Sequence, residues 1–262
     1  MHIPIRSVRR RAWPTLLLPW LLAFAAAALA QTPAESVDDP VARSILEKAD
    51  QIRFPQEGFQ VEIAIVTNRD GQPTEERKYR VLSKGNENTI VQTTKPAAER
   101  GQILLMKGRD LWLFVPNVSQ PVRLSLAQRL TGVVSNGDIA RANFSGDYNP
   151  TLVGTEKIGD EAFHVLELIA IDRTVTYQKV RYWVRQSNGA PHKAEFYSLS
   201  DRLLKTCSYE NYRALGGKVR PTRLVMVDAV KADTRSVMDY NEMRLVELPD
   251  KMFTKEYLKK VQ

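Results

Sequence analysis

The feature that most constrains the fold is a change of hydrophobic period at Phe59. From Phe59 to Ile65 every second residue lies on one apolar face, which is typical of a strand with one buried side. Similar segments recur along the rest of the chain, and glycine, asparagine and aspartate fill the short links between them. The further strands predicted are residues 77–84, 88–94, 102–107, 111–115, 151–157, 162–171, 175–185, 191–199, 203–213, 222–230 and 235–246.

Links this short join antiparallel neighbours, because parallel strands need a crossover of about a dozen residues or more. No crossover helix is predicted after Gly146. We therefore predict a mainly β (α+β) fold in which a single, strongly twisted antiparallel sheet curls into an open barrel. The chain shows no internal repeat and no linker between domains, so residues 31–262 are expected to form one domain.

One helix is predicted before the strands. Asp39 can accept hydrogen bonds from the first helical turn, and Pro40 follows at the position where its missing N–H costs nothing. Pro55 disfavours helical angles at Phe54, so the helix should end near Arg53. The apolar stripe that we expect to pack on the sheet consists of Val41, Ile45, Ala49 and Ile52.

The region from Leu104 to Tyr148 departs from the regular alternation. Leu111 to Val115 is apolar at every position, so both faces of this strand should meet apolar surroundings. Ser125 and Gln128 have the spacing of a capping box, which predicts a short helix that ends at Gly132. Its face carries Leu126, Ala127 and Leu130 and continues to Val133. Such a short helix needs cover, either as a plug in the core or as a movable lid over an apolar cavity.

The first 30 residues have the pattern of an export signal. Four arginines precede an apolar run that ends in Ala28-Leu29-Ala30, so we expect cleavage after Ala30 and a periplasmic mature protein. A membrane anchor and a twin-arginine signal are the alternatives. Without these residues the mature chain has 34 basic and 30 acidic residues, a net charge of +4 (38 − 4 − 30), which gives no indication of nucleic-acid binding.

Residues that could support catalysis are sparse. The mature chain has two histidines, His164 and His192, and neither has a second metal ligand at a suitable spacing. The single cysteine, Cys207, excludes an intramolecular disulfide and a thiolate metal site. Nothing in the sequence brings Asp138, Asp147 and Asp160 together as an acid and a base. We therefore expect a protein without metal or cofactor that is not an enzyme.

Several segments together resemble the outer-membrane lipoprotein-sorting proteins of the LolA-like superfamily. The segments are Asp39-Pro40, residues 45–55 (ILEKADQIRFP), 112–116 (WLFVP), 136–141 (NGDIAR), Asn143-Phe144, Asp147-Tyr148, 182–184 (YWV), Lys205-Thr206, Gly216-Gly217, 220–222 (RPT), 248–250 (LPD), Phe253-Thr254 and Tyr257-Leu258. No single motif is decisive for this resemblance. The segments occur in a characteristic order and spacing, and together they extend over the mature chain.

The resemblance implies an open half-barrel of about eleven strands, closed by the N-terminal helix and short lid helices over an apolar cavity that holds acyl chains. The implied cargo is a lipid or an acylated lipoprotein, carried by a monomer between an inner-membrane transporter and an outer-membrane acceptor. The cavity and lid candidates are Trp112, Phe114, Leu124, Leu126, Leu130, Val133, Ile139 and Phe144.

Two other functions remain open on sequence alone. The same cavity would serve a lipid-sensing regulator or an accessory subunit of a lipid exporter, whereas a hydrolase is disfavoured by the missing nucleophile and base. No motif identifies an arginine that locks the lid. Arg123, Arg129 and Arg141 are candidates by position only.

Overall fold

The structure is a computed structural model that describes residues 39–141, 143–231 and 233–261. The predicted signal peptide and the residues that follow it, up to residue 38, lie outside this part of the chain. Residues 36–262 group into one compact unit, and the described part of that unit is dominated by a single sheet. No helix among the described residues has the length and apolar character needed to cross a bilayer.

The sheet has 13 strands and every pairing in it is antiparallel. Its strands are β1 (Phe59–Arg69), β2 (Glu75–Lys84), β3 (Asn88–Lys95), β4 (Ile103–Lys107), β5 (Asp110–Phe114), β6 (Val122–Leu124), β9 (Tyr148–Ile158), β10 (Glu161–Ala170), β11 (Lys179–Arg185), β12 (Pro191–Tyr197), β13 (Leu203–Leu215), β14 (Lys218–Asp228) and β15 (Thr234–Leu245).

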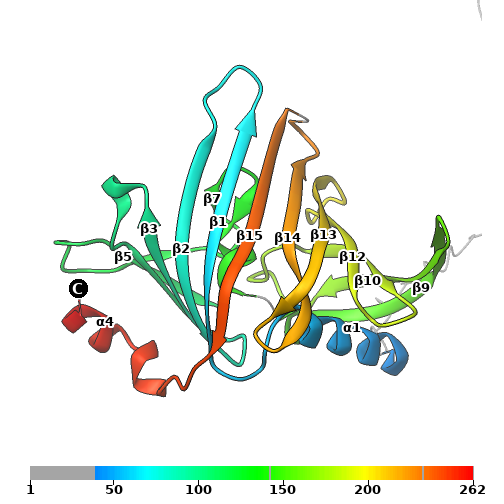
Figure 1. Ribbon diagram of the computed structural model, residues 1–262, viewed down its shortest axis with the longest axis horizontal. Helices are drawn as coiled ribbons and strands as arrows, with labels where there is room; N and C mark the ends of the chain where they lie inside the picture. Colours follow the sequence, from blue (N-terminus) through cyan, green and yellow to red (C-terminus); the bar gives the residue numbers. More distant parts are fainter. Residues whose placement is uncertain (1–38, 142, 232, 262) are drawn as a thin grey trace, which may run out of the picture. The chain divides into compact units, whose positions relative to one another are not determined.

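Two meanders make up the sheet, one from β1 to β6 and one from β9 to β15, and they join where β1 pairs with β15 (Figure 1). Ile63 there lies opposite Tyr240 on one side and Tyr79 on the other. The outermost strands are β6 and β9, so the sheet remains open. The predicted single, open, antiparallel sheet is confirmed, with 13 strands in place of about eleven.

The helix α1 (Pro40–Arg53) begins and ends where the sequence predicts. Asp39 caps it by accepting from the amides of Val41 and Ala42, each at 3.0 Å. Its buried face differs from the predicted stripe, because Val41 is 58% exposed. The buried residues of α1 are Ala42, Leu46, Ala49, Asp50 and Arg53. The helix contacts β9, β12 and β14, and its two buried charged side chains reach Phe144 and Ser145 and also Tyr209 of β13.

The predicted helix over residues 125–132 is absent. The Ser125 hydroxyl accepts from the amide of Ala127 at 3.2 Å, which makes a turn, and the chain then forms the hairpin of β7 (Arg129–Thr131) and β8 (Val134–Ser135). The helices of this region follow the hairpin as α2 (Asn136–Ala140) and α3 (Phe144–Asp147). We call residues 125–141 and 143–147 the lid segment.

The two faces of β5 have different covers. Leu111 and Leu113 belong to the main apolar cluster on the inner face of the sheet, which the lid segment and α1 cover. Trp112 and Phe114 lie on the outer face in a second cluster. That cluster is covered by residues 248–260, the cap segment, which contains η2 (Asp250–Phe253) and most of α4 (Lys255–Val261) (Figure 1). A further short helix, η1 (Ala97–Glu99), precedes β4.

Candidate functional site: a lidded interior

The hairpin of the lid segment is fixed to the sheet at Gly132. This residue has a φ of +52°, a conformation that favours glycine. A Cβ atom added there would lie 2.2 Å from Thr67 Oγ1 and 2.3 Å from Ser236 Oγ. The next amide, that of Val133, donates to Ser236 Oγ at 3.0 Å. The backbone of the hairpin thus contacts β1 and β15 directly at a position that no other residue type fits.

The helix α2 is held by a buried charge pair. Lys205 Nζ of β13 lies 2.5 Å from Asp138 Oδ2, and the two side chains are 3% and 7% exposed. The Tyr177 hydroxyl donates to Asp138 at 3.0 Å, and burial raises the pKa of Tyr177 well above its usual value, so it stays protonated. The amide of Ser135 also donates to Asp138 Oδ2, at 2.7 Å. The carboxylate of Asp138 therefore accepts hydrogen bonds from Lys205, Tyr177 and the Ser135 amide, and these contacts position α2.

The helix α3 is held by α1. Asp50 Oδ2 accepts from the amide of Ser145 at 2.7 Å, and the guanidinium of Arg53 lies 4.2 Å from the centre of the Phe144 ring. Arg53 Nη1 and Asp50 Oδ1 are 3.3 Å apart. Burial raises the pKa of Asp50 to about 6, although the charge of Arg53 opposes this shift. Asp50 is thus an acid that titrates close to neutral pH beneath the lid segment.

A third set of contacts, made by Arg141, fixes the C-terminal part of the lid segment. Arg141 donates to both oxygens of Asp147, at 2.5 and 2.7 Å, and to the carbonyl of Gly108 at 2.8 Å. Of the three candidate locking arginines, Arg141 is the buried one, at 3% side-chain exposure. Arg123 is 73% exposed and pairs with Asp110, whereas Arg129 is 59% exposed and lies 3.8 Å from Asp228.

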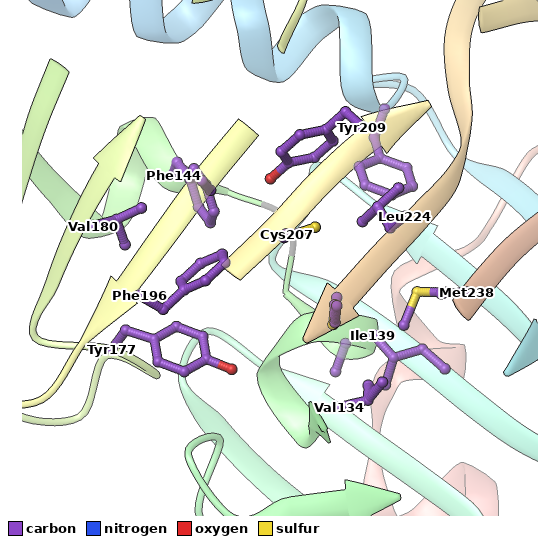
Figure 2. Packing of buried hydrophobic residues seen from close by; sticks show 14 of the residues in the cluster. Val134, Ile139, Phe144, Tyr177, Val180, Phe196, Cys207, Tyr209, Leu224 and Met238 are labelled. Atoms are coloured by element: carbon purple, nitrogen blue, oxygen red, sulfur yellow. The ribbon is translucent and has the colours of Figure 1, made fainter. Parts of the chain in front are cut away.

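The interior beneath these contacts combines apolar and aromatic side chains with the charged groups of Arg53, Asp138, Arg141 and Asp147. Figure 2 shows Ile139 of α2 and Phe144 of α3 facing side chains of the sheet, with Tyr177 and Phe196 nearby. A small cavity remains between the lid segment, β13 and β14. The volume that the centre of a water molecule can occupy in it is about 20 Å³. This is little more than one water requires, at about 10–15 Å³. In this conformation the interior is filled by its own side chains.

Six of the eight sequence-predicted site residues belong to the main apolar cluster or pack against it, and of these Phe144 lines the cavity. Leu126, Val133, Ile139 and Phe144 are buried in the main cluster, and Leu124 and Leu130 pack against it while partly exposed. Trp112 and Phe114 do not join them. The expectation that these two residues wall the same cavity is corrected, because they lie on the outer face, under Phe253 and Leu258 of the cap segment.

Sequence reasoning missed Lys205, Asp50 and Arg53. Lys205, Cys207 and Tyr209 occupy every second position of β13 and lie on its inner face. The period of two in this strand could therefore have identified Lys205 as an inward-facing residue. Asp50 and Arg53 were missed because the chosen helical stripe was purely apolar. Among the described residues no cluster of three or more histidine, cysteine or acidic side chains could hold a metal ion. His192 stacks on Phe163, with ring centres 4.5 Å apart.

The fold and this site together define a class: an open antiparallel sheet whose inner face is closed by a short helical lid. A family model described as that of an uncharacterized protein matches residues 85–260. A LolA superfamily protein from Nitrosomonas europaea is 63% identical, with 82% of this chain and 98% of that chain covered and a TM-score of 0.80. No curated protein matches the chain.

Two more distant structures share the fold. A DUF1329 family protein from Desulfovibrio piger is 22% identical, with 84% and 99% of the two chains covered and a TM-score of 0.73. A protein domain from Vibrio parahaemolyticus assigned to outer membrane lipoprotein sorting is 19% identical, with 84% and 99% covered and a TM-score of 0.70. The chain belongs to the LolA superfamily, as its identity to the Nitrosomonas europaea protein shows.

Proposed function

We propose that this protein is a periplasmic carrier that binds the acyl chains of lipoproteins or other lipids beneath its lid segment and moves them toward the outer membrane. The observation that carries the proposal is the interior itself, where apolar and aromatic side chains of the sheet meet apolar side chains of a short, separately anchored segment. The role is binding and not catalysis. An inner-membrane transporter would load the carrier and an outer-membrane acceptor would unload it.

Binding requires the lid segment to move. Pockets for small molecules have volumes of about 300–1,000 Å³, far more than the closed cavity of about 20 Å³. Each acyl methylene taken out of water contributes about 0.8 kcal/mol, so a long chain can offset the loss of several polar contacts. The contacts of Asp138, Ser145 and Asp147 can be replaced by water when the segment moves, because they are hydrogen bonds and ion pairs.

The proposal is tested with a fluorescent acyl probe added to protein stripped of endogenous lipid. Leu130, on the lid segment, packs partly buried against the main cluster, and Leu199 is 70% exposed on a turn. Leu130→Glu should weaken probe binding at least about tenfold, because an unpaired carboxylate is costly in apolar surroundings. Leu199→Glu is the matched control and should bind like the wild type. A wild-type protein that binds no probe would refute the carrier.

Export and cargo are tested on the protein from its own host. N-terminal sequencing of the periplasmic fraction should begin at Gln31, whereas Met1 retained in a membrane pellet would contradict export. Native mass spectrometry followed by lipid extraction should then find a bound lipid or acylated lipoprotein.

A further inference from the structure

A groove opens on the surface beside the lid segment. Its volume is about 330 Å³, within the range of small-molecule sites. It lies between the β7–β8 hairpin, the loop before β11, the start of β13 and the end of β14. The residues that line it are Ala127, Arg129, Val133, Ser135, Thr176, Tyr177, Arg202, Leu204, Lys205, Asp228, Val230 and Lys231.

The rim of this groove carries a net positive charge. Arg129, Arg202 and Lys231 are exposed. Within the described part of the chain, neither Arg202 nor Lys231 has an acidic partner within 4.0 Å, and the acid nearest to Arg129 is Asp228 at 3.8 Å. Oδ1 of Asp228 accepts from the amides of Val230 and Lys231 at 2.8 and 2.9 Å, which leaves its negative charge in place. The rim therefore has three cations and one carboxylate, a net charge of +2 (3 − 1).

The lining of the groove is partly apolar. Ala127, Val133, Leu204 and Val230 supply this part, which we call the floor, and Val230 remains 58% exposed. Positive charge above an apolar floor complements a molecule with an anionic group next to an apolar part. A small inorganic anion would use only the rim.

The groove and the interior share a wall. Thr176 and Tyr177 line both the groove and the cavity under the lid segment. The contacts between Lys205, Asp138 and Tyr177 stand at this wall, and Asp138 belongs to the lid segment. A movement of α2 that breaks these contacts would open the groove to the interior. The groove thus lies at the mouth of the proposed acyl site.

We propose that this groove binds the anionic phosphate headgroup of a lipid whose acyl chain enters the interior, so that the protein selects acidic over zwitterionic lipids. The inference rests on the proposed carrier function and names the class of cargo. Arg129, Arg202 and Lys231 contact the phosphate by charge-assisted hydrogen bonds, and the floor receives the first part of the chain.

The test compares two lysolipids with the same acyl chain, lysophosphatidylglycerol and lysophosphatidylcholine, in competition with a neutral apolar dye. The wild type should bind lysophosphatidylglycerol about tenfold more tightly, which is the combined effect of a few exposed charge contacts. The triple variant Arg129→Gln, Arg202→Gln and Lys231→Gln should lose this preference and still bind the neutral apolar dye. Added salt should reduce the preference in the wild type.

The matched control is Lys157→Gln, Lys218→Gln and Arg244→Gln, which removes three exposed cations on β9, β14 and β15 that do not line the groove. This variant should keep the preference. Glycerol phosphate and an acidic peptide test the other sources of negative charge. Competition by glycerol phosphate as strong as that by the lysolipid would assign the groove to a free phosphate ester. Competition by the peptide alone would assign it to a protein partner, and either outcome overturns the inference.

The two proposals fail differently. Equal binding of the two lysolipids would refute the headgroup site and leave the carrier intact. Failure of the dye and of both lysolipids to bind would refute the carrier itself.

Discussion

The lid segment and the cap segment both cover a face of the same sheet, but they are attached in different ways. The lid segment combines buried apolar side chains with polar contacts, among them the ion pair of Lys205 with Asp138 and the hydrogen bond from the Ser145 amide to Asp50. The cap segment is held by apolar burial, with Leu248, Phe253 and Leu258 packed against the outer face of β3, β4 and β5. Lys255 adds a cation–π contact to Trp112 at 3.9 Å.

This difference bears on which cover can move. Polar contacts of a lid are exchanged for contacts with water when it opens, so their net contribution is about 0.5–1.5 kcal/mol each. Apolar burial is lost outright on exposure, at about 25 cal/mol per Å². The lid segment also buries apolar side chains, among them Leu126, Val134 and Phe144, so its opening requires a ligand that replaces their contacts. We therefore expect a bound acyl chain to displace the lid segment and to leave the cap segment in place.

The largest expected effect is on the cap segment. Phe253 is 1% exposed and belongs to the outer cluster. Phe253→Ala should lower the free energy of unfolding by about 3–5 kcal/mol, because it leaves a cavity. Binding of an acyl probe at a temperature where the variant is folded should be unchanged. A loss of probe affinity in this variant would show that the outer face takes part in binding.

The next effect concerns pH and Asp50. Its folded pKa of about 6 is above the ordinary value of 3.8, so the folded state holds the proton more tightly than the unfolded state. The contribution of Asp50 to stability is complete below pH 3.8 and is lost as the pH rises to about 6. Compared with Asp50→Asn, the wild type should lose about four-fifths of this contribution between pH 4 and pH 7, out of about 3 kcal/mol in total, from 2.2 units at 1.36 kcal/mol each.

Denaturant titrations of both proteins at the two pH values measure this difference. The variant is a suitable reference because asparagine is neutral at both. A difference between the two proteins that does not change with pH would mean that Asp50 titrates normally and is less buried than the structure shows.

A smaller effect on stability is expected when the ion pair between Lys205 and Asp138, which positions α2, is removed. Lys205→Met removes the partner of Asp138, and because the lid segment can carry Asp138 back to water, the cost should be limited to about 1–3 kcal/mol. The acyl probe should bind faster than to the wild type, measured by stopped-flow fluorescence. Lys193→Met on the outer face, where Lys193 lies over Trp183, is the control and should leave the rate unchanged. Equal rates in all three proteins would place the barrier to binding elsewhere.

The smallest effect is expected for Tyr177→Phe. This change removes the hydrogen bonds of the hydroxyl to Asp138 and to the Ser135 hydroxyl, and it leaves the ring in place beside Phe196. Stability should fall by about 1 kcal/mol, and the rate of probe binding should rise slightly. A larger fall than for Lys205→Met would show that the tyrosine, and not the charge pair, holds α2.

Much of the scaffold could be predicted from the sequence. Alternation from Phe59 onward and turn residues between the segments located most strands, and Asp39-Pro40 located the start of α1. These features depend on neighbours in the chain, which a sequence pattern records. The strand β6 was missed because Val122–Leu124 is short and lies at the edge, with two of its three residues exposed.

The site was harder to predict because it depends on contacts between distant residues. The uniform apolarity of β5 showed that both of its faces are covered, but not that Trp112 meets the C-terminal segment. The Ser125–Gln128 spacing suggested a helix, whereas Gly132 is required seven residues later for close approach to Thr67 and Ser236. The chain therefore turns there, and α2 follows the hairpin in the chain.

Hydrogen–deuterium exchange with and without a saturating acyl ligand tests most directly whether the lid segment is the cover that opens. Exchange in residues 125–141 and 143–147 should increase when ligand displaces these residues from the inner face, whereas residues 248–260 should keep their protection. Unchanged protection of the lid segment at full occupancy, or increased exchange in the cap segment alone, would contradict the account.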